Sequence, residues 1–94
     1  MKQKRDGQKS YRHADHISWR KVGEDAVLLD QNTSLYFSIN NVGALIWERL
    51  GAGTDLASIR EEICREFSVE PERAQKHMDE FIQELCAKNV LVPL

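Results

Sequence analysis

Long apolar runs, cysteine pairs and prolines are scarce in this sequence of 94 residues. No apolar stretch approaches the roughly 20 residues that a helix needs to cross a bilayer, and the polar N-terminal segment lacks the apolar core of a secretion signal. The sequence therefore predicts a cytoplasmic protein without a membrane partner. The two cysteines, Cys64 and Cys86, lie far apart among helix-forming residues. We expect two reduced thiols there rather than a disulfide or a metal site.

The chain also lacks a cluster of reactive side chains. Its histidines, His13, His16 and His77, do not have the spacing of a metal site or a catalytic triad, and His77 is expected on a helix surface. The segment 51–53 (Gly-Ala-Gly) is too short for a phosphate-binding loop and is typical of a helix end. Neighbouring carboxylates such as Glu61 and Glu62 diverge by about 100° around a helix. The sequence thus predicts a protein that is not an enzyme and that holds no cofactor and no metal.

Charge is distributed unevenly along the chain. The first 16 residues carry five basic and two acidic side chains, a net charge of +3, so the remainder carries −5 of the total of −2. Residues 1–14 contain almost no apolar side chains, so we expect a flexible basic tail there, followed by one domain over residues 15–94. An acidic domain does not favour a nucleic-acid surface.

Three short strands are expected after the tail. Ile17 and Trp19 alternate with polar residues, and residues 26–29 form a compact apolar run. Turn residues occupy 22–25 and 30–33. The clearest strand signal lies in residues 34–39, where Leu, Phe and Ile alternate with Ser and Tyr. Strands joined by short turns form an antiparallel meander.

Three helices are expected after the strands. Asn40 is a suitable N-cap for the first, Thr54 or Asp55 for the second, and Pro71 is a favoured first residue for the third. Asn89 is expected to end the third helix, and residues 90–92 to add a short closing strand. The order predicts an α+β fold of the winged helix-turn-helix type, with a three-stranded antiparallel sheet followed by a three-helix bundle.

The last strand of this meander is a candidate edge for peptide binding. Residues 33–39 carry neither the lysine nor the proline that would protect an edge against added strands. An extended peptide binds such an edge through backbone hydrogen bonds. One flank of the third helix, with Gln75, Asp79, Gln83 and Cys86, was a candidate for the second wall of a groove.

Two other functions remain open from the residues alone. A winged helix of this type often reads DNA with its third helix, although acidic residues outnumber basic ones there. The open edge also allows a structural or oligomerising role, such as a homodimer through the edge strand.

An ordered set of residues resembles the PqqD-like family, also known as the recognition elements of RiPP precursor peptides, the ribosomally synthesised and post-translationally modified peptides. The set consists of Leu28-Leu29-Asp30, then Tyr36-Phe37-Ser38-Ile39-Asn40, then Gly43-Ala44-Leu45-Ile46-Trp47, followed by Leu50 and Gly53. The similarity covers about residues 16–93 and is greatest to the stand-alone members of lasso-peptide and radical-SAM pathways.

The resemblance implies a winged helix that acts as a peptide chaperone. It implies that the leader of a precursor peptide binds as an added strand against the third strand and the third helix. It also implies presentation to a modifying enzyme, a radical-SAM enzyme in pyrroloquinoline quinone (PQQ) biosynthesis or a leader peptidase in lasso pathways. The peptide-binding positions that it implies are Ser34, Leu35, Tyr36, Phe37, Ser38, Ile39, Gln75, Met78, Asp79 and Ile82.

The chain departs from the family pattern at two places. Many members carry Asp-Val four and three residues before the phenylalanine of the third helix, where this chain has His77-Met78. Many end that helix with Gly-Leu, where this chain has Asn89 before Val90 and Leu91. The first change lies on the helix that would wall the groove, so a different leader preference is expected.

Overall fold

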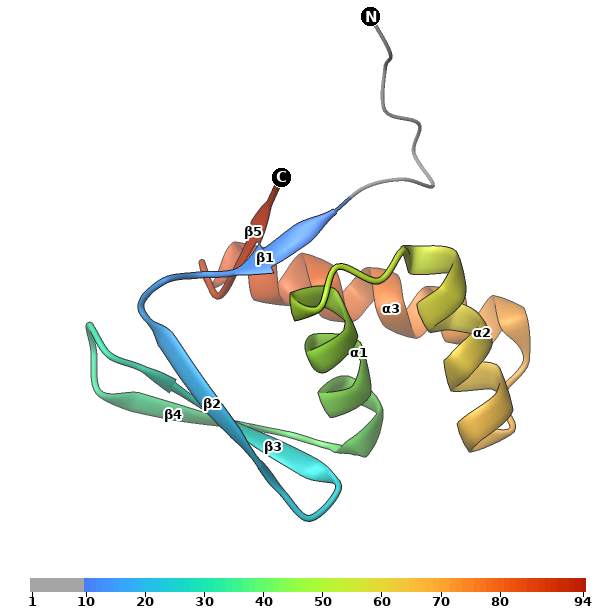
Figure 1. The fold of residues 1–94 in the computed structure, drawn as a ribbon, viewed down its shortest axis with the longest axis horizontal. Coiled ribbons are helices and arrows are strands. Elements are labelled where there is room, and N and C mark those ends of the chain that lie inside the picture. The colour runs from blue at the N-terminus through green and yellow to red at the C-terminus, as the bar shows by residue number, and fades with distance from the viewer. Residues whose placement is uncertain (1–9) are drawn as a thin grey trace, which may run out of the picture.

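The computed structural model describes residues 10–94, which form five strands and three helices (Figure 1). All three helices lie on one side of a three-stranded antiparallel sheet, and a separate two-stranded ladder joins the ends of the described chain. The α+β winged-helix arrangement is as predicted. The elements in chain order are β1 (Tyr11–His13), β2 (Ile17–Val22), β3 (Asp25–Asp30), β4 (Leu35–Ile39), α1 (Asn41–Gly51), α2 (Leu56–Phe67), α3 (Pro71–Ala87) and β5 (Leu91–Pro93).

The expected tail over residues 1–14 is wrong for its last residues. Tyr11–His13 form β1, which pairs antiparallel with β5, and Ala14 is 5% exposed. Composition pointed to a tail because this segment has few apolar side chains. The segment is ordered instead by backbone pairing and by His13, whose ring stacks on Trp47 with the ring centres 3.5 Å apart. Residues 1–9 of the expected tail lie outside the described residues.

The main sheet is the predicted meander in the order β2-β3-β4. Its register pairs Trp19 with Leu28 and Leu28 with Phe37, so these three side chains share one face. Ala26 and Leu28 on that face are fully buried, because α1 packs against it. The neighbouring positions, including Leu29 and Tyr36, point to the opposite face.

Local capping explains where the helices begin. The Asn40 side chain accepts a hydrogen bond from the backbone N–H of Gly43 at 2.9 Å, and Asp55 caps α2 in the same way through Ser58. Pro71 opens α3 as predicted, and Asn89 follows it with a left-handed φ of 61°. Within residues 10–94, no helix is both long and apolar enough to cross a membrane.

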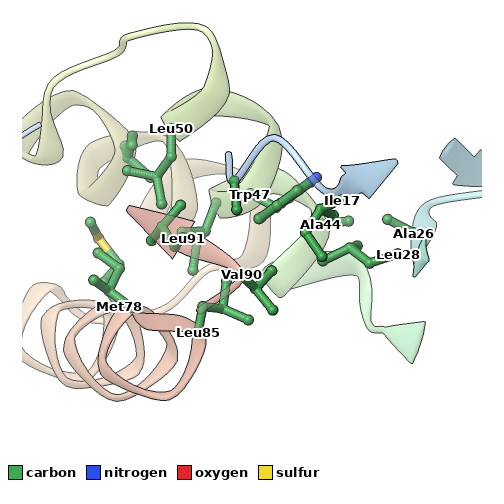
Figure 2. Packing of buried hydrophobic residues seen from close by; sticks show 14 of the residues in the cluster. Ile17, Ala26, Leu28, Ala44, Trp47, Leu50, Met78, Leu85, Val90 and Leu91 are labelled. Carbon is green, nitrogen blue, oxygen red and sulfur yellow. The ribbon is translucent and has the colours of Figure 1, made fainter. Parts of the chain in front are cut away.

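The hydrophobic core lies between α1, α3 and the two sheets (Figure 2). Trp47 of α1 and Met78 of α3 are fully buried, and Leu91 of β5 is 2% exposed. At about 25 cal/mol per Å² of buried apolar surface, these large side chains supply much of the stabilising free energy. The remaining contact between α1 and α2 includes a bidentate ion pair in which Arg49 donates to both carboxylate oxygens of Glu62 at 2.8 Å.

Candidate functional site

The outer edge of β4 is an exposed sheet edge. The strand order leaves β2 and β4 as the two edges of the main sheet, but β2 carries the exposed charges Arg20 and Lys21, whereas β4 carries no charged residue and no proline. Leu35 and Tyr36 of β4 are 60% and 70% exposed. An uncharged edge of this kind favours the addition of another strand.

A groove lies between β4 and α3, and we call it the β4–α3 groove. Its first part has a volume of about 240 Å³, with an apolar floor that includes Phe37, Phe81 and Leu85. A second hollow of about 230 Å³ continues it along α3 past the N-terminus of α1. The two parts share Asn40, Phe81 and Glu84. An extended peptide on β4 would therefore place alternate side chains into an elongated apolar groove.

Gly43 allows the Phe81 ring, which lines the groove, to lie against the first turn of α1. A Cβ atom at this position would lie 3.0 Å from Cε1 of Phe81 and 3.3 Å from Cζ. Phe81 thus packs directly on the first turn of α1. The absence of a side chain at Gly43 sets the depth of this part of the groove.

The rim of the groove is polar and carries both charges. Lys88 places its Nζ 5.3 Å from the ring centre of Phe37 and 3.2 Å from Oε2 of Glu84. Further along the rim lie His77 and Glu80. An apolar floor with a charged rim is typical of peptide-binding grooves, in which burial gives affinity and polar groups set orientation.

The predicted strand contacts fall mostly on this site. Phe37, Ser38 and Ile39 line the groove, and Leu35 lies on the same face of β4 as Phe37. Tyr36 points to the opposite face of the sheet, next to Leu29. Ser34 also lies away from the groove, because it precedes the strand in a turn with a left-handed φ of 65° and donates its N–H to the Asp30 carbonyl.

The four residues of the third helix that were predicted to contact the peptide do not line the groove. Met78 is fully buried and Ile82 is 7% exposed, so both belong to the core beneath it. Gln75 accepts from Arg60 of α2 and donates to Asp79, which places this pair on the far flank of α3. Cys86, on the same flank, is half-buried and lies close enough to Tyr11 of β1 to raise the pKa of its hydroxyl.

The pKa values on that far flank support this placement. Burial raises the pKa of the Tyr11 hydroxyl, and Cys86 and Asp79 raise it further. Burial also raises the pKa of the Cys86 thiol. Cys86 lies two positions, or about 200°, around the helix from Glu84, so its flank faces away from the flank that lines the groove.

Sequence reasoning missed the helix residues that do line the groove, namely Phe81, Glu84, Leu85 and Lys88. Phe81 and Leu85 recur at helical spacing with Met78, and such an apolar stripe indicates a core-facing side rather than a groove. Glu84 and Lys88 are four residues apart and thus share a helix flank, which the sequence shows. The choice between the two flanks depends on how α3 docks, and that contact lies outside the local pattern.

Other chemistry is limited in the described part of the chain. Among residues 10–94, no three His, Cys, Asp or Glu side chains converge on a point where they could hold a metal ion. Cys64 and Cys86 are both half-buried free thiols, as expected.

Comparison with known proteins gives one family and two solved structures. The profile of the family described as Coenzyme PQQ synthesis protein D (PqqD) matches residues 25–91. A structure described as "TbiB1 in Complex with the TbiA(beta) Leader Peptide" has a TM-score of 0.78 and 29% sequence identity, covering 85% of this chain and 93% of that chain. A second, "Lasso peptide synthetase B1 complexed with the leader peptide", has a TM-score of 0.78 and 27% identity, covering 90% and 98%. A comparison with curated proteins finds no match.

The matched region includes every element of the candidate site. It runs from Asp25, the first residue of β3, to Leu91, the first residue of β5, and so contains β4, α3 and the groove between them. The two structures share the whole fold with this chain at nearly their full length. The protein is therefore a member of the PqqD family.

Proposed function

We propose that this protein binds the leader of a ribosomally synthesised precursor peptide as an added strand on β4 and presents it to a modifying enzyme. The observation that carries the proposal is the uncharged edge of β4 beside the apolar β4–α3 groove. The two similar structures support it, because each is described as a complex with a leader peptide. In this role the domain itself performs no catalysis.

Each part of the site has a separate task in this mechanism. Backbone N–H and C=O groups of Leu35 to Ile39 supply hydrogen bonds that accept any sequence. Phe37, Phe81 and Leu85 supply apolar contacts that select alternate leader residues. At the rim, the positive Lys88 and the negative Glu84 favour a leader that places an acidic residue near Lys88 and a basic residue near Glu84. Holding the leader raises the local concentration of the attached core peptide near an enzyme active site.

DNA binding is a weaker candidate for the same α3. The acidic residues Glu72, Asp79, Glu80 and Glu84 are all exposed on this helix. Phosphate groups would be repelled by them, and phosphate contacts supply much of the affinity for DNA.

The test is calorimetry with the leader peptide encoded beside this gene and with copies that are N-methylated at one residue each. On a strand, successive N–H groups point to opposite sides, so only alternate residues of the leader bond to β4. We expect a loss of about tenfold or more in affinity at every second position and little change between them. A uniform response, or no binding of the unmodified leader, would contradict strand addition.

Matched variants locate the binding edge. Leu35→Ser removes an exposed apolar side chain from the β4 edge and is expected to weaken leader binding by about tenfold. Val22→Ser is the control, because Val22 is similarly exposed at 52% but lies on the other edge strand. Its leader affinity should stay within about twofold of the original chain.

A further inference from the structure

The face of the main sheet that points away from the helices carries an apolar patch. It consists of side chains from all three strands, and the helices leave it uncovered (Figure 1). The register aligns Ser18, Leu29 and Tyr36 in one row and Arg20 with Val27 in the next. A hollow of about 360 Å³ opens there, and its lining includes Ser18, Arg20, Val22, Val27, Leu29 and Tyr36. We call these six residues the outer sheet patch.

The composition of this patch does not fit a surface that only contacts water. One face of an antiparallel sheet is commonly solvated and polar. Here Val22 is 52% and Tyr36 70% exposed, and Val27 and Leu29 between them are only half-buried. Exposed apolar side chains that lie next to one another favour an interaction site on this face.

The charge of the patch restricts its occupant. Arg20 is its one charged residue, and it is exposed. Lys21, its neighbour on the opposite face, pairs with Glu48 at 3.5 Å, whereas no ion pair among residues 10–94 involves Arg20. Asp25 lies beside Val22 in the register but outside the hollow. A partner that offers both apolar side chains and a carboxylate fits this patch.

A second copy of the protein and the protein's own N-terminal segment both fit this patch less well. A second copy would bring another Arg20 into the interface, and no residue that lines the hollow offers it a carboxylate. The segment that precedes Ser10 contains four basic residues and one acidic residue, Asp6. Its net charge is therefore positive, like that of Arg20. Charge therefore favours a different protein.

The position of Tyr36 connects the patch to the peptide site. Tyr36 belongs to the patch, yet it lies on β4, between Leu35 and Phe37, which face the groove side. A protein docked on the patch would thus contact the same strand that holds the leader, from the other face of the sheet.

We infer that the outer sheet patch is the docking surface for the peptide-modifying enzyme, which presents an apolar surface with a carboxylate opposite Arg20. This inference rests on the proposed function for the identity of the partner. It assigns the two faces of the same sheet to two tasks, with the leader on the edge and groove and the enzyme on the outer face.

The test measures two affinities of the full chain. The probes are the purified peptide-modifying enzyme encoded beside this gene, measured by biolayer interferometry, and the labelled leader peptide, measured by fluorescence anisotropy. Arg20→Glu is expected to weaken enzyme binding by about tenfold or more and to leave leader affinity within about twofold. Arg73→Glu is the matched control, because Arg73 is also exposed but lies on α3, and it should change neither affinity.

The outcomes separate this inference from the proposed function. Equal enzyme affinity of the original chain and Arg20→Glu would overturn the docking surface, as would a parallel loss of leader binding. A dimer in sedimentation that Arg20→Glu dissociates, with enzyme binding unchanged, would assign the patch to a second copy instead. Enzyme binding that depends on Arg20 without any leader binding would support the docking surface and overturn the proposed function.

Discussion

Asn40 connects the end of the binding strand to the start of the first helix. It follows Ile39 directly, has an extended backbone with φ −76° and ψ −179°, and accepts the N–H of Gly43 at 2.9 Å. It also lines both parts of the β4–α3 groove. One amide side chain therefore fixes the angle at which β4 turns into α1.

Loss of this cap is expected to cost stability. Asn40→Ala leaves the Gly43 N–H without its acceptor and should lower the free energy of unfolding by about 1 kcal/mol. Urea denaturation followed by circular dichroism measures this. Asn40→Asp is the control, because a carboxylate accepts the same bond at a helix N-terminus and should retain the stability. Equal destabilisation by both substitutions would show that the amide acts through another contact.

At the scale of elements, α3 has two flanks with different tasks. Glu84 and Lys88 line the groove beside β4, whereas Gln75 accepts from Arg60 of α2 and donates to Asp79. The buried residues between them, such as Met78, hold the helix to the core. A peptide on β4 would contact only the first flank.

Paired alanine substitutions distinguish the flanks. Glu84→Ala with Lys88→Ala is expected to lower leader affinity by about threefold to tenfold, because both side chains line the groove and Lys88 lies over the Phe37 ring. The control pair, Gln75→Ala with Asp79→Ala, removes the hydrogen bond from Arg60 to Gln75 and the one from Gln75 to Asp79, and should change affinity by less than about twofold. Titration calorimetry with the leader measures both. A larger loss from the control pair would place the peptide on the other flank.

The sequence predicted the elements well because their signals are local. The alternation in residues 34–39, the cap at Asn40 and the proline at the start of α3 each involve residues within a few positions of one another. The cap and the proline were confirmed, and the strand was confirmed over Leu35–Ile39. The face of β4 that meets the helices also follows from alternation alone. The flank of α3 that meets the groove does not, because a helix with an apolar stripe can roll either way until its partners are known.

At the scale of the whole molecule, the missed strand β1 joins the two ends of the described chain. Ala14 donates its N–H to the Val90 carbonyl at 3.0 Å, and His13 Nε2 lies 2.8 Å from the Trp47 carbonyl oxygen. A Cβ at Gly51 would overlap the His13 ring, so this close approach depends on glycine there. These contacts join residues more than thirty positions apart, so no local pattern predicts them.

This closure makes stability depend on the protonation of His13. Burial lowers the pKa of His13 below its usual value of 6.5, while the hydrogen bond to Trp47 opposes that shift. Because the folded chain binds the proton less tightly than the unfolded chain, the free energy of unfolding falls as the pH drops through about 6.5. It levels off below the pKa of the folded state. His13→Gln, which keeps a donor for the Trp47 carbonyl but does not titrate, should remove this part of the pH dependence.

Urea denaturation of both chains between pH 8 and pH 5 measures the difference. All other side chains are the same in both chains, so subtracting the two curves isolates the effect of His13. The expected result is a gap in unfolding free energy that shifts in favour of His13→Gln as the solution becomes more acidic. A difference in unfolding free energy that stays constant across this range would mean that the contacts of β1 are equally stable with either protonation state of His13.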